Sequence, residues 1–174
     1  VGMLVDEAVR LIRGKEGTKV VLTVEKKDKT IKEVTMTREE VQIEDTFARS
    51  IIVNSPDGKK YGFISLPSFN ADFEDAKGRN ASDDIKNELI KLKAQNVEGI
   101  VLDLRNNGGG SLTEVGDIMG LFMNAGAYVQ VKDGNGKIQT LRNKSNAPIW
   151  TGPLVIMQNE LSASASEILA GAVQ

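Results

Sequence analysis

The sequence contains no cysteine and no histidine, and these two absences exclude several kinds of active site. Without cysteine, the chain has no disulfide, no thiolate zinc site and no cysteine nucleophile. Without histidine, it has no Ser-His-Asp triad of its own, and zinc sites built on imidazole are excluded as well. Any serine nucleophile within these 174 residues must therefore use a base other than imidazole.

Aromatic residues and net charge are also scarce. Aromatic residues make up 5% of the chain and the net charge is −2, so neither a base-stacking platform nor a basic surface for nucleic acid is expected. No apolar run reaches the roughly 18 residues that a membrane-spanning helix needs, and no signal peptide precedes the first expected helix. The chain opens like the inside of a domain, and we interpret both of its ends as cuts.

The first 37 residues predict a helix followed by a β-hairpin. Residues 3–13 carry an apolar stripe typical of an amphipathic helix, made of Leu4, Ala8, Leu11 and Ile12. Residues 19–24 and 30–37 are β-rich and are joined by a polar segment, which indicates a hairpin. A helix and a hairpin are too small to bury a core alone, so we interpret them as the end of a small domain.

The character of the sequence changes at about residue 38, and from residue 61 onward strands and helices alternate, which predicts an α/β layered fold. The expected strands are residues 41–43, 50–53, 61–66, 99–104, 128–132, 138–141 and 153–157. The expected helices begin near Ser82, at the S-x-x-E capping box of Ser111 and Glu114 (continuing to Gly126), and at Ser162. Residues 99–104 and 153–157 are almost wholly apolar, as is typical of strands buried on both faces.

The first turn of chemical interest is the run Gly108-Gly109-Gly110, which follows the strand expected at residues 99–104. Glycines permit a sharp turn, and backbone amides at the start of a helix can stabilise negative charge. No G-K-[ST] follows, which excludes a P-loop. Two interpretations remain open on this pattern alone, namely a plain tight turn and a turn that binds an oxyanion.

The second turn contains Ser162-Ala163-Ser164-Ala165-Ser166-Glu167, between an expected strand and an expected helix. A serine held there can present its hydroxyl as a nucleophile while neighbouring amides form an oxyanion hole. Ser164 and Glu167 also match the S-x-x-E capping box, so Ser164 could simply cap the helix. Nucleophile and cap are both compatible with this local pattern.

Together, the two motifs resemble those of the carboxy-terminal processing peptidases, also called tail-specific proteases (S41 serine peptidases). The resemblance is carried by residues 99–114, centred on Leu104-Arg105-Asn106-Asn107-Gly108-Gly109-Gly110, and by residues 162–174. Residues 63–69 resemble the strand that precedes these motifs, residues 38–45 the link from a PDZ domain, and residues 5–14 its last helix. The resemblance implies an α/β, ClpP/crotonase-like protease core in residues 38–174, preceded by a PDZ remnant in residues 1–37.

The resemblance also implies a serine endopeptidase with a Ser-Lys dyad that cleaves proteins recognised by their C-terminal tails. Ser164 matches the nucleophile, the amides of Ala165 and of Gly109 or Gly110 match the oxyanion hole, and Glu167 matches a supporting acidic position. The base is a lysine whose pKa must be lowered before it can accept a proton. In the family this lysine lies further along than Gln174, so we expect this chain to be truncated before its base and inactive alone.

The resemblance further implies no cofactor and no metal, a bacterial periplasm or cell envelope, protein substrates with free C-terminal tails, and allows a homo-oligomer. Two other functions remain open for this fold. An acyl-CoA enzyme would use the glycine amides for a thioester oxyanion, although such an enzyme needs no serine nucleophile at Ser164. A non-catalytic peptide-binding scaffold would keep the fold without the chemistry, and a lysine beyond Gln174 would separate a peptidase from it.

Overall fold

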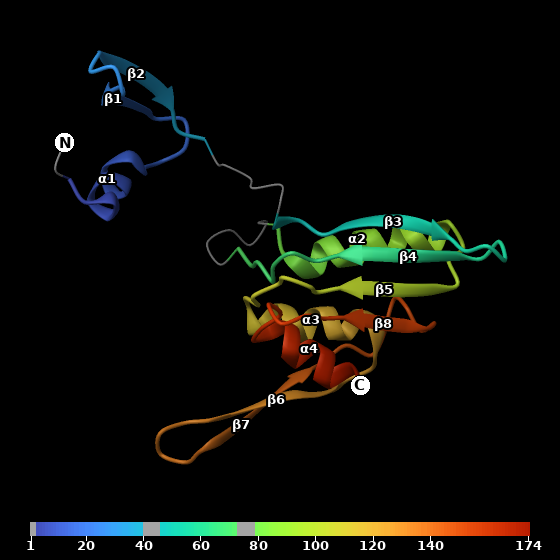
Figure 1. The fold of residues 1–174 in the computed structure, drawn as a ribbon. Helices are drawn as coiled ribbons and strands as arrows, with labels where there is room; N and C mark the ends of the chain where they lie inside the picture. The colour runs from blue at the N-terminus through green and yellow to red at the C-terminus, as the bar shows by residue number, and fades with distance from the viewer. Residues whose placement is uncertain (1–2, 40–45, 73–78) are drawn as a thin grey trace. The chain divides into compact units, whose positions relative to one another are not determined.

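The computed structural model describes residues 3–39, 46–72 and 79–174, and Figure 1 labels their helices and strands. The chain divides into two compact units, Val1–Ile43 and Glu44–Gln174. The strand expected at residues 41–43 lies outside the described residues, as does most of the link expected at residues 38–45.

The first unit is a helix followed by an antiparallel hairpin: α1 (Val5–Ile12), β1 (Lys19–Glu25) and β2 (Ile31–Thr37). The predicted order is present, but none of the unit's described side chains is fully buried, and Leu4 and Leu11 are 76% and 62% exposed. The Arg38 guanidinium ties the helix to the hairpin by donating to the carbonyl oxygens of Ile12 and Lys19. The apolar stripe of α1 thus finds no core within this unit, as expected for elements so small.

The second unit is built on a four-stranded sheet, whose spatial order is β3 (Arg49–Asn54), β4 (Lys60–Ser65), β5 (Gly99–Asp103) and β8 (Leu154–Met157). β3 pairs antiparallel with β4, whereas β4, β5 and β8 run parallel. Three helices and a hairpin accompany the sheet: α2 (Ala81–Ala94), α3 (Leu112–Phe122), α4 (Ala165–Val173), β6 (Gly126–Lys132) and β7 (Ile138–Asn143). The predicted α/β class is confirmed.

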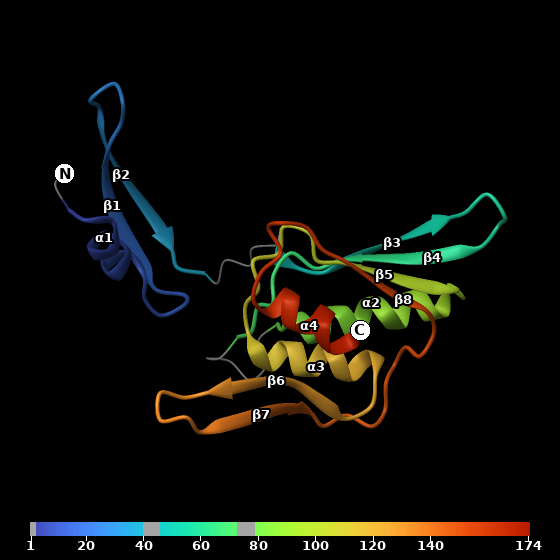
Figure 2. The same ribbon diagram turned by 60° about the horizontal axis from the view of Figure 1, so that its bottom comes forward.

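The core of this unit lies between the sheet and the helices α2, α3 and α4, which cover one face of the sheet (Figure 2). Strand and helix side chains are fully buried there, among them Ile64, Leu102, Ile85, Leu89, Ile118 and Leu169. Each such side chain contributes about 1.5–3 kcal/mol on burial. The β6–β7 hairpin contacts α3 and α4 on their far side from the sheet. This packing fixes the ends of β5 and β8, from which both motif turns leave.

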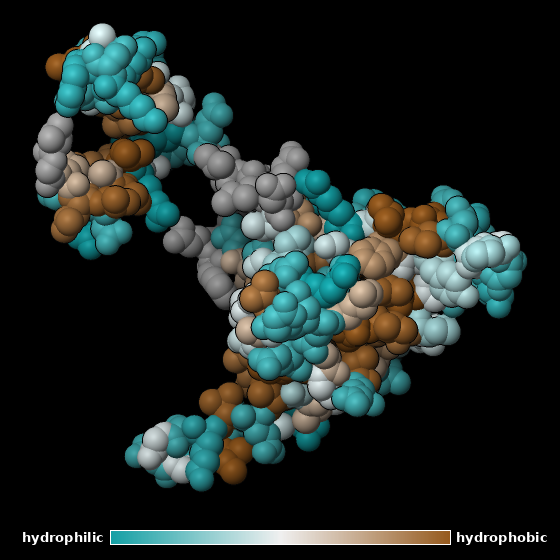
Figure 3. All heavy atoms as spheres, viewed as in Figure 1, coloured by the Kyte–Doolittle hydropathy of each residue, from teal (hydrophilic) through white to brown (hydrophobic). Residues whose placement is uncertain are grey.

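The other face of the sheet carries a row of apolar side chains that crosses all four strands. The row is in register, and its members are Ile51, Phe63, Val101 and Val155. Ile51 is 62% and Val155 is 56% exposed, and hydrophobic residues gather at the surface over these strands (Figure 3). The prediction that residues 153–157 form a strand buried on both faces is therefore wrong. β8 is an edge strand of the described sheet, and its outer face meets the surface.

Helix ends account for two further differences from the predictions. α3 stops at Phe122 instead of continuing to Gly126, because Met123 is extended and β6 starts at Gly126. α4 begins at Ala165 instead of Ser162. Residues 159–163 form a turn in which Ser162 Oγ accepts the N–H of Asn159 at 3.0 Å, and this turn delays the helix.

The capping box predicted at Ser111 and Glu114 is only half formed. Ser111 Oγ accepts the N–H of Glu114 at 3.4 Å, but the Glu114 carboxylate instead accepts the N–H of Ser82, at the start of α2, at 2.7 Å. Glu114 is 4% exposed, and its burial raises the pKa of its carboxyl, with the carboxylates of Asp117 and Asp83 adding to the rise. The sequence pattern misses this contact because the competing N–H belongs to another helix.

Replacing Asp117 with asparagine is expected to stabilise the 174-residue chain at pH 7. Partial desolvation and the Asp83 carboxylate raise the pKa of Asp117 in the folded chain, so stability falls as the pH rises through that folded pKa. Asp117→Asn removes this loss, and since the side chain is exposed, screening by solvent limits the gain to about 0.5 kcal/mol. Thermal melting should show a higher melting temperature for Asp117→Asn than for the wild type at pH 7, and no difference at about pH 4. An equal gain at both pH values would contradict this origin.

Candidate active site

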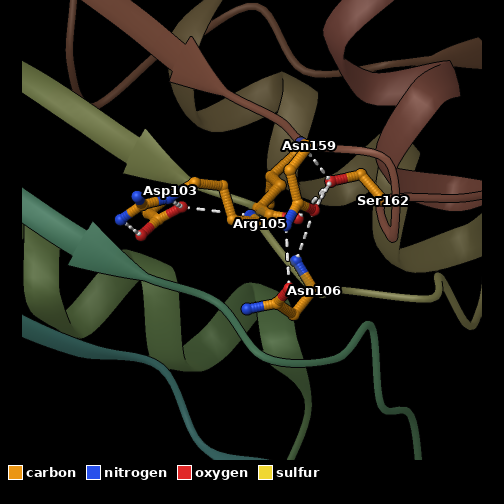
Figure 4. A network of polar contacts seen from close by, with 6 residues as sticks. Asp103, Arg105, Asn106, Asn159 and Ser162 are labelled. Carbon is orange, nitrogen blue, oxygen red and sulfur yellow. Dashed lines mark hydrogen bonds and ion pairs between the residues drawn. The ribbon is translucent and has the colours of Figure 1, made fainter.

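The two motif turns meet at the carboxyl ends of the neighbouring parallel strands β5 and β8. The N–H of Leu104 donates to the carbonyl oxygen of Met157 at 2.9 Å, which extends the ladder past β5. Beyond it, Asn106 and Asn159 form a reciprocal pair (Figure 4). Asn159 Oδ1 accepts the N–H of Asn106 at 2.8 Å, and Asn159 Nδ2 donates to Asn106 Oδ1 at 2.8 Å. The turns predicted to carry chemistry therefore form one site.

An ion pair closes the start of the glycine turn. Arg105 Nε and its terminal nitrogen donate to the two carboxylate oxygens of Asp103 at 2.9 and 2.8 Å, and the N–H of Arg105 also donates to that carboxylate (Figure 4). Hydrogen bonds from Arg105 lower the pKa of Asp103, so the carboxylate stays ionised. The pair fixes the direction in which the chain leaves β5.

Two of the three serines in the second turn hold the turn together. Ser162 Oγ donates to the carbonyl oxygen of Leu104 at 2.7 Å, and Figure 4 shows its side chain between the two turns. Ser166 is fully buried, and its Oγ donates to the carbonyl oxygen of Asn107 at 2.9 Å. Both hydroxyls are thus committed to main-chain acceptors in the first turn.

Ser164 differs from its two neighbours in exposure and in backbone conformation. It is exposed and it is the N-cap of α4, with φ 54° and ψ −113°. A positive φ is uncommon for a residue with a Cβ, and such strained conformations cluster at functional sites. A serine on a sharp, strained turn between a strand and a helix is the arrangement that presents a nucleophile in α/β-hydrolases. The cap and nucleophile interpretations therefore fall on one residue and are compatible.

Glu167 supports this turn from the first turn of α4. Its carboxylate accepts the N–H of Ser164 at 2.8 Å, so it contacts the backbone of the serine. This is the glutamate half of a capping box, and it satisfies an amide that the helix leaves without an acceptor. The contact holds the strained residue in place.

Gly109 and Gly110 lie where only glycine fits. Gly109 has φ +104°, and a Cβ there would lie 2.9 Å from Ser164 Cβ and 3.0 Å from the nitrogen of Ala165. Gly110 has φ +144°, and a Cβ there would lie 2.4 Å from the carbonyl oxygen of Phe69. The glycine turn therefore packs directly against Ser164 on one side and against the segment after β4 on the other.

The amides of this turn are not equivalent. The N–H of Gly109 donates to Asn107 Oδ1 at 2.8 Å, so it is already committed. Within residues 3–39, 46–72 and 79–174, the N–H groups of Gly110 and Ala165 have no acceptor. Both amides therefore remain available to stabilise negative charge beside Ser164.

Asn107 and Asn159 are among the residues of this site to which the sequence pattern assigned no role. Asn107 is fully buried and contacts both turns, and Asn159 joins them through Asn106. An asparagine at the end of each parallel strand is a signal, because its side chain commonly bonds nearby backbone and replaces a ladder partner. In the described part of the chain, no cluster of three or more acidic side chains could hold a metal ion.

Comparison with known proteins assigns the fold. The model of peptidase family S41 matches residues 60–174, a range that contains both turns. The chain is 38% identical over 175 residues to the tail-specific protease of Haemophilus influenzae, covering 100% of the chain and 24% of that protein. It is 34% identical over 170 residues to the carboxyl-terminal-processing protease of Picosynechococcus, covering 97% of the chain and 38% of that protein.

A solved structure agrees with these relatives. The photosystem II D1 C-terminal processing protease superposes with a TM-score of 0.63 at 26% identity, over 99% of this chain and 45% of that one. The layered α/β protease core predicted from the motifs is thereby confirmed. The chain spans 24% and 38% of the length of the two relatives named above, each of which is a protease by name. From the family match, the identity to these relatives and the shared fold, we conclude that this chain belongs to peptidase family S41.

Proposed function

We propose that this chain supplies the nucleophile and the oxyanion hole of a serine endopeptidase that cleaves proteins recognised by their C-terminal tails. The single observation that carries the proposal is the conformation of Ser164, which is exposed and strained on the turn between β8 and α4. Its neighbours Ser162 and Ser166 hold the turn with their hydroxyls, which leaves Ser164 as the serine able to attack a substrate.

The oxyanion hole in this proposal consists of the amides of Gly110 and Ala165. Both lack an acceptor within the described residues, and both adjoin the contact between Ser164 and the glycine turn. Gly109 contributes its shape, since its N–H already donates to Asn107. Two preorganised N–H groups aimed at the developing oxyanion are the usual device of acyl transfer. Glu167 supports the nucleophile through the Ser164 amide.

The proposed base is a lysine that lies outside these 174 residues. A serine hydroxyl needs a base to become a useful nucleophile, and histidine is absent from the sequence. A lysine can accept the proton when burial lowers its pKa. In this scheme Oγ attacks the scissile carbonyl, lysine takes the proton and returns it to the leaving amine, and water then hydrolyses the acyl-enzyme.

The proposed substrates are proteins with a free C-terminal carboxylate, processed in the periplasm or envelope of a bacterium. The PDZ-like helix and hairpin of residues 1–37 would belong to the tail-binding domain. The names of the two bacterial relatives support both the tail specificity and the bacterial setting. None of the described helices is long and apolar enough to cross a membrane.

Cleavage of one substrate in two forms tests this function. The full-length protein should cleave an unfolded polypeptide with an apolar, free C-terminus faster than the same polypeptide with an amidated C-terminus. The 174-residue chain should fold and cleave neither, because the base is missing. Mass spectrometry of the products provides the measurement. Turnover by the 174-residue chain would place the base inside it, and an inactive full-length protein that still binds the tail would favour a scaffold.

A further inference from the structure

Asn107 lies at the centre of the site, and its polar groups are satisfied by three segments of the chain. It is fully buried, on the turn that follows β5. Its main-chain N–H donates to the carbonyl oxygen of Leu104 at 3.2 Å, which closes that turn. Its side chain and its carbonyl oxygen reach the segment after β4, the glycine turn and the serine turn. No step of the proposed mechanism described above involves Asn107.

The side chain of Asn107 bridges two backbone groups of opposite character. Nδ2 donates to the carbonyl oxygen of Leu66 at 2.7 Å, and Oδ1 accepts the N–H of Gly109 at 2.8 Å. The position therefore needs a short side chain with one donor and one acceptor, which the amide supplies. Both contacts are buried, so losing either leaves a polar group without a partner.

The carbonyl oxygen of Asn107 holds the serine turn on both sides of the nucleophile. It accepts the N–H of Ala163 at 3.1 Å and the hydroxyl of Ser166 at 2.9 Å. Ser164 lies between these two residues in the chain, with its strained φ of 54°. Such strain persists only where the surroundings over-determine the conformation, and a shared acceptor on both sides provides that constraint.

The side-chain and main-chain contacts of Asn107 hold neighbouring parts of the site, namely the glycine turn and the serine turn. Oδ1 fixes the peptide plane that ends at Gly109, whose α-carbon packs against Ser164 and Ala165. The next amide along is that of Gly110, whose N–H has no acceptor among the described residues. The peptide that carries the Gly110 N–H is itself held by Phe69, whose N–H donates to the carbonyl oxygen of Gly109 at 3.0 Å. Asn107 and Phe69 thus hold the two peptide planes that meet at Gly109, and losing the Asn107 contact would leave only the Phe69 hydrogen bond to place the Gly110 amide.

We propose that Asn107 is a positioning residue of the peptidase: its side chain aims the Gly110 amide at the oxyanion while its carbonyl oxygen holds Ser164 in its strained conformation. The inference rests on the proposed function and adds a residue that touches no reacting atom. Its side chain is the part that a substitution can test, since the main-chain contacts are common to every residue type.

Two substitutions in the full-length protein separate the two side-chain contacts. Asn107→Ala removes both, and it should lower kcat about 10²-fold, the usual cost of misplacing a catalytic group, with KM changed less than about twofold. Asn107→Asp keeps an acceptor for the Gly109 N–H but sets a carboxylate against the Leu66 carbonyl oxygen. Asn107→Asp should therefore keep a higher kcat than Asn107→Ala, although its melting temperature should be equal to or lower than that of Asn107→Ala.

Asn143→Ala is the matched control for the loss of a buried amide. Asn143 is 5% exposed, and its side chain holds another turn by donating to the carbonyl oxygens of Met123 and Asn124. This variant should melt at a lower temperature and keep kcat within about twofold, since it removes hydrogen bonds without touching the oxyanion hole. kcat and KM come from peptide hydrolysis, and melting comes from circular dichroism of the same preparations.

The order of the variants decides the outcome. Loss of kcat in step with the fall in melting temperature across all three variants would reduce Asn107 to a structural residue and overturn the proposal. So would a kcat within about twofold of wild type in Asn107→Ala, given the size of effect expected for oxyanion donors. Ser164→Ala, assayed in parallel, should be inactive. Cleavage retained by that variant would overturn the proposed function itself, a failure visible independently of Asn107.

Discussion

Ser164→Ala is expected to abolish cleavage by the full-length protein while substrate binding stays nearly unchanged. The hydroxyl is the proposed nucleophile, and removing it leaves the oxyanion hole and the fold in place, so kcat falls and KM does not. The residue is exposed at a strained turn, as the N-cap of α4 and beside Gly109. Peptide hydrolysis gives kcat, and binding of an uncleaved tail peptide gives affinity.

Ser162→Ala and Ser166→Ala are the matched controls, because they remove the same atom from the same turn. Ser166→Ala loses the hydrogen bond to the Asn107 carbonyl oxygen, and Ser162→Ala loses the one to the Leu104 carbonyl oxygen and the acceptor for the Asn159 N–H. Each variant should lose about 0.5–1.5 kcal/mol of stability per hydrogen bond while keeping substantial activity. Ser164→Gly should be as inactive as Ser164→Ala but more stable by about 1 kcal/mol or more, since glycine adopts a positive φ without strain. An essential Ser162 or Ser166 beside a dispensable Ser164 would show that the site is out of register.

Gly110→Ala is expected to lower kcat by about 10²–10³-fold, because it displaces a proposed oxyanion donor. The new Cβ would clash with the carbonyl oxygen of Phe69, which is a backbone atom and not the end of a flexible side chain. Gly109→Ala should act from the other side, since its Cβ would meet Ser164 Cβ and the carbonyl oxygen of Ala163, both at 2.9 Å. Both variants also lose stability, as each places an alanine at a positive φ.

Gly108→Ala is the control for this pair. Gly108 belongs to the same run, but a Cβ there meets nothing within 4 Å and its φ is not in the left-handed region. It should therefore keep kcat and melting temperature close to those of the wild type. Equal losses at all three glycines would show general sensitivity of the turn, and an unchanged kcat in Gly110→Ala with normal melting would remove Gly110 from the oxyanion hole.

Much of the fold could be predicted from the sequence, because hydrophobic periodicity is a local signal. The alternation of strands and helices, the hairpin of β1 and β2, and Ser111 at the start of α3 all depend on neighbouring residues. The predictions were wrong where contacts with a distant segment of the chain determine the structure. The Glu114 carboxylate binds the start of another helix, and Val155 reaches the surface because α2, α3 and α4 cover the opposite face of the sheet (Figure 2).

The candidate site, like the fold, was predictable where local sequence determines it and not where long-range contacts do. The order and spacing of the two motifs identified the two turns, and the structure shows that these turns meet. Periodicity could not distinguish three serines that all sit in one small-residue run. What distinguishes them is long-range: Ser162 and Ser166 bond to residues of the glycine turn, and Ser164 does not share their acceptors. The role of Asn107 was likewise hidden, since its contacts reach Leu66 and Ala163 across the sheet.

A crystal structure of the full-length protein with a peptidyl boronic acid would test the central claim most directly, because boron forms a tetrahedral adduct with a serine nucleophile. The account predicts a covalent bond from Ser164 Oγ to boron, with one boronate oxygen within about 2.7–3.1 Å of the amide nitrogens of Gly110 and Ala165. A lysine from outside residues 1–174 should lie beside Oγ. An adduct on another residue, or a boronate oxygen that faces away from both amides, would contradict the account.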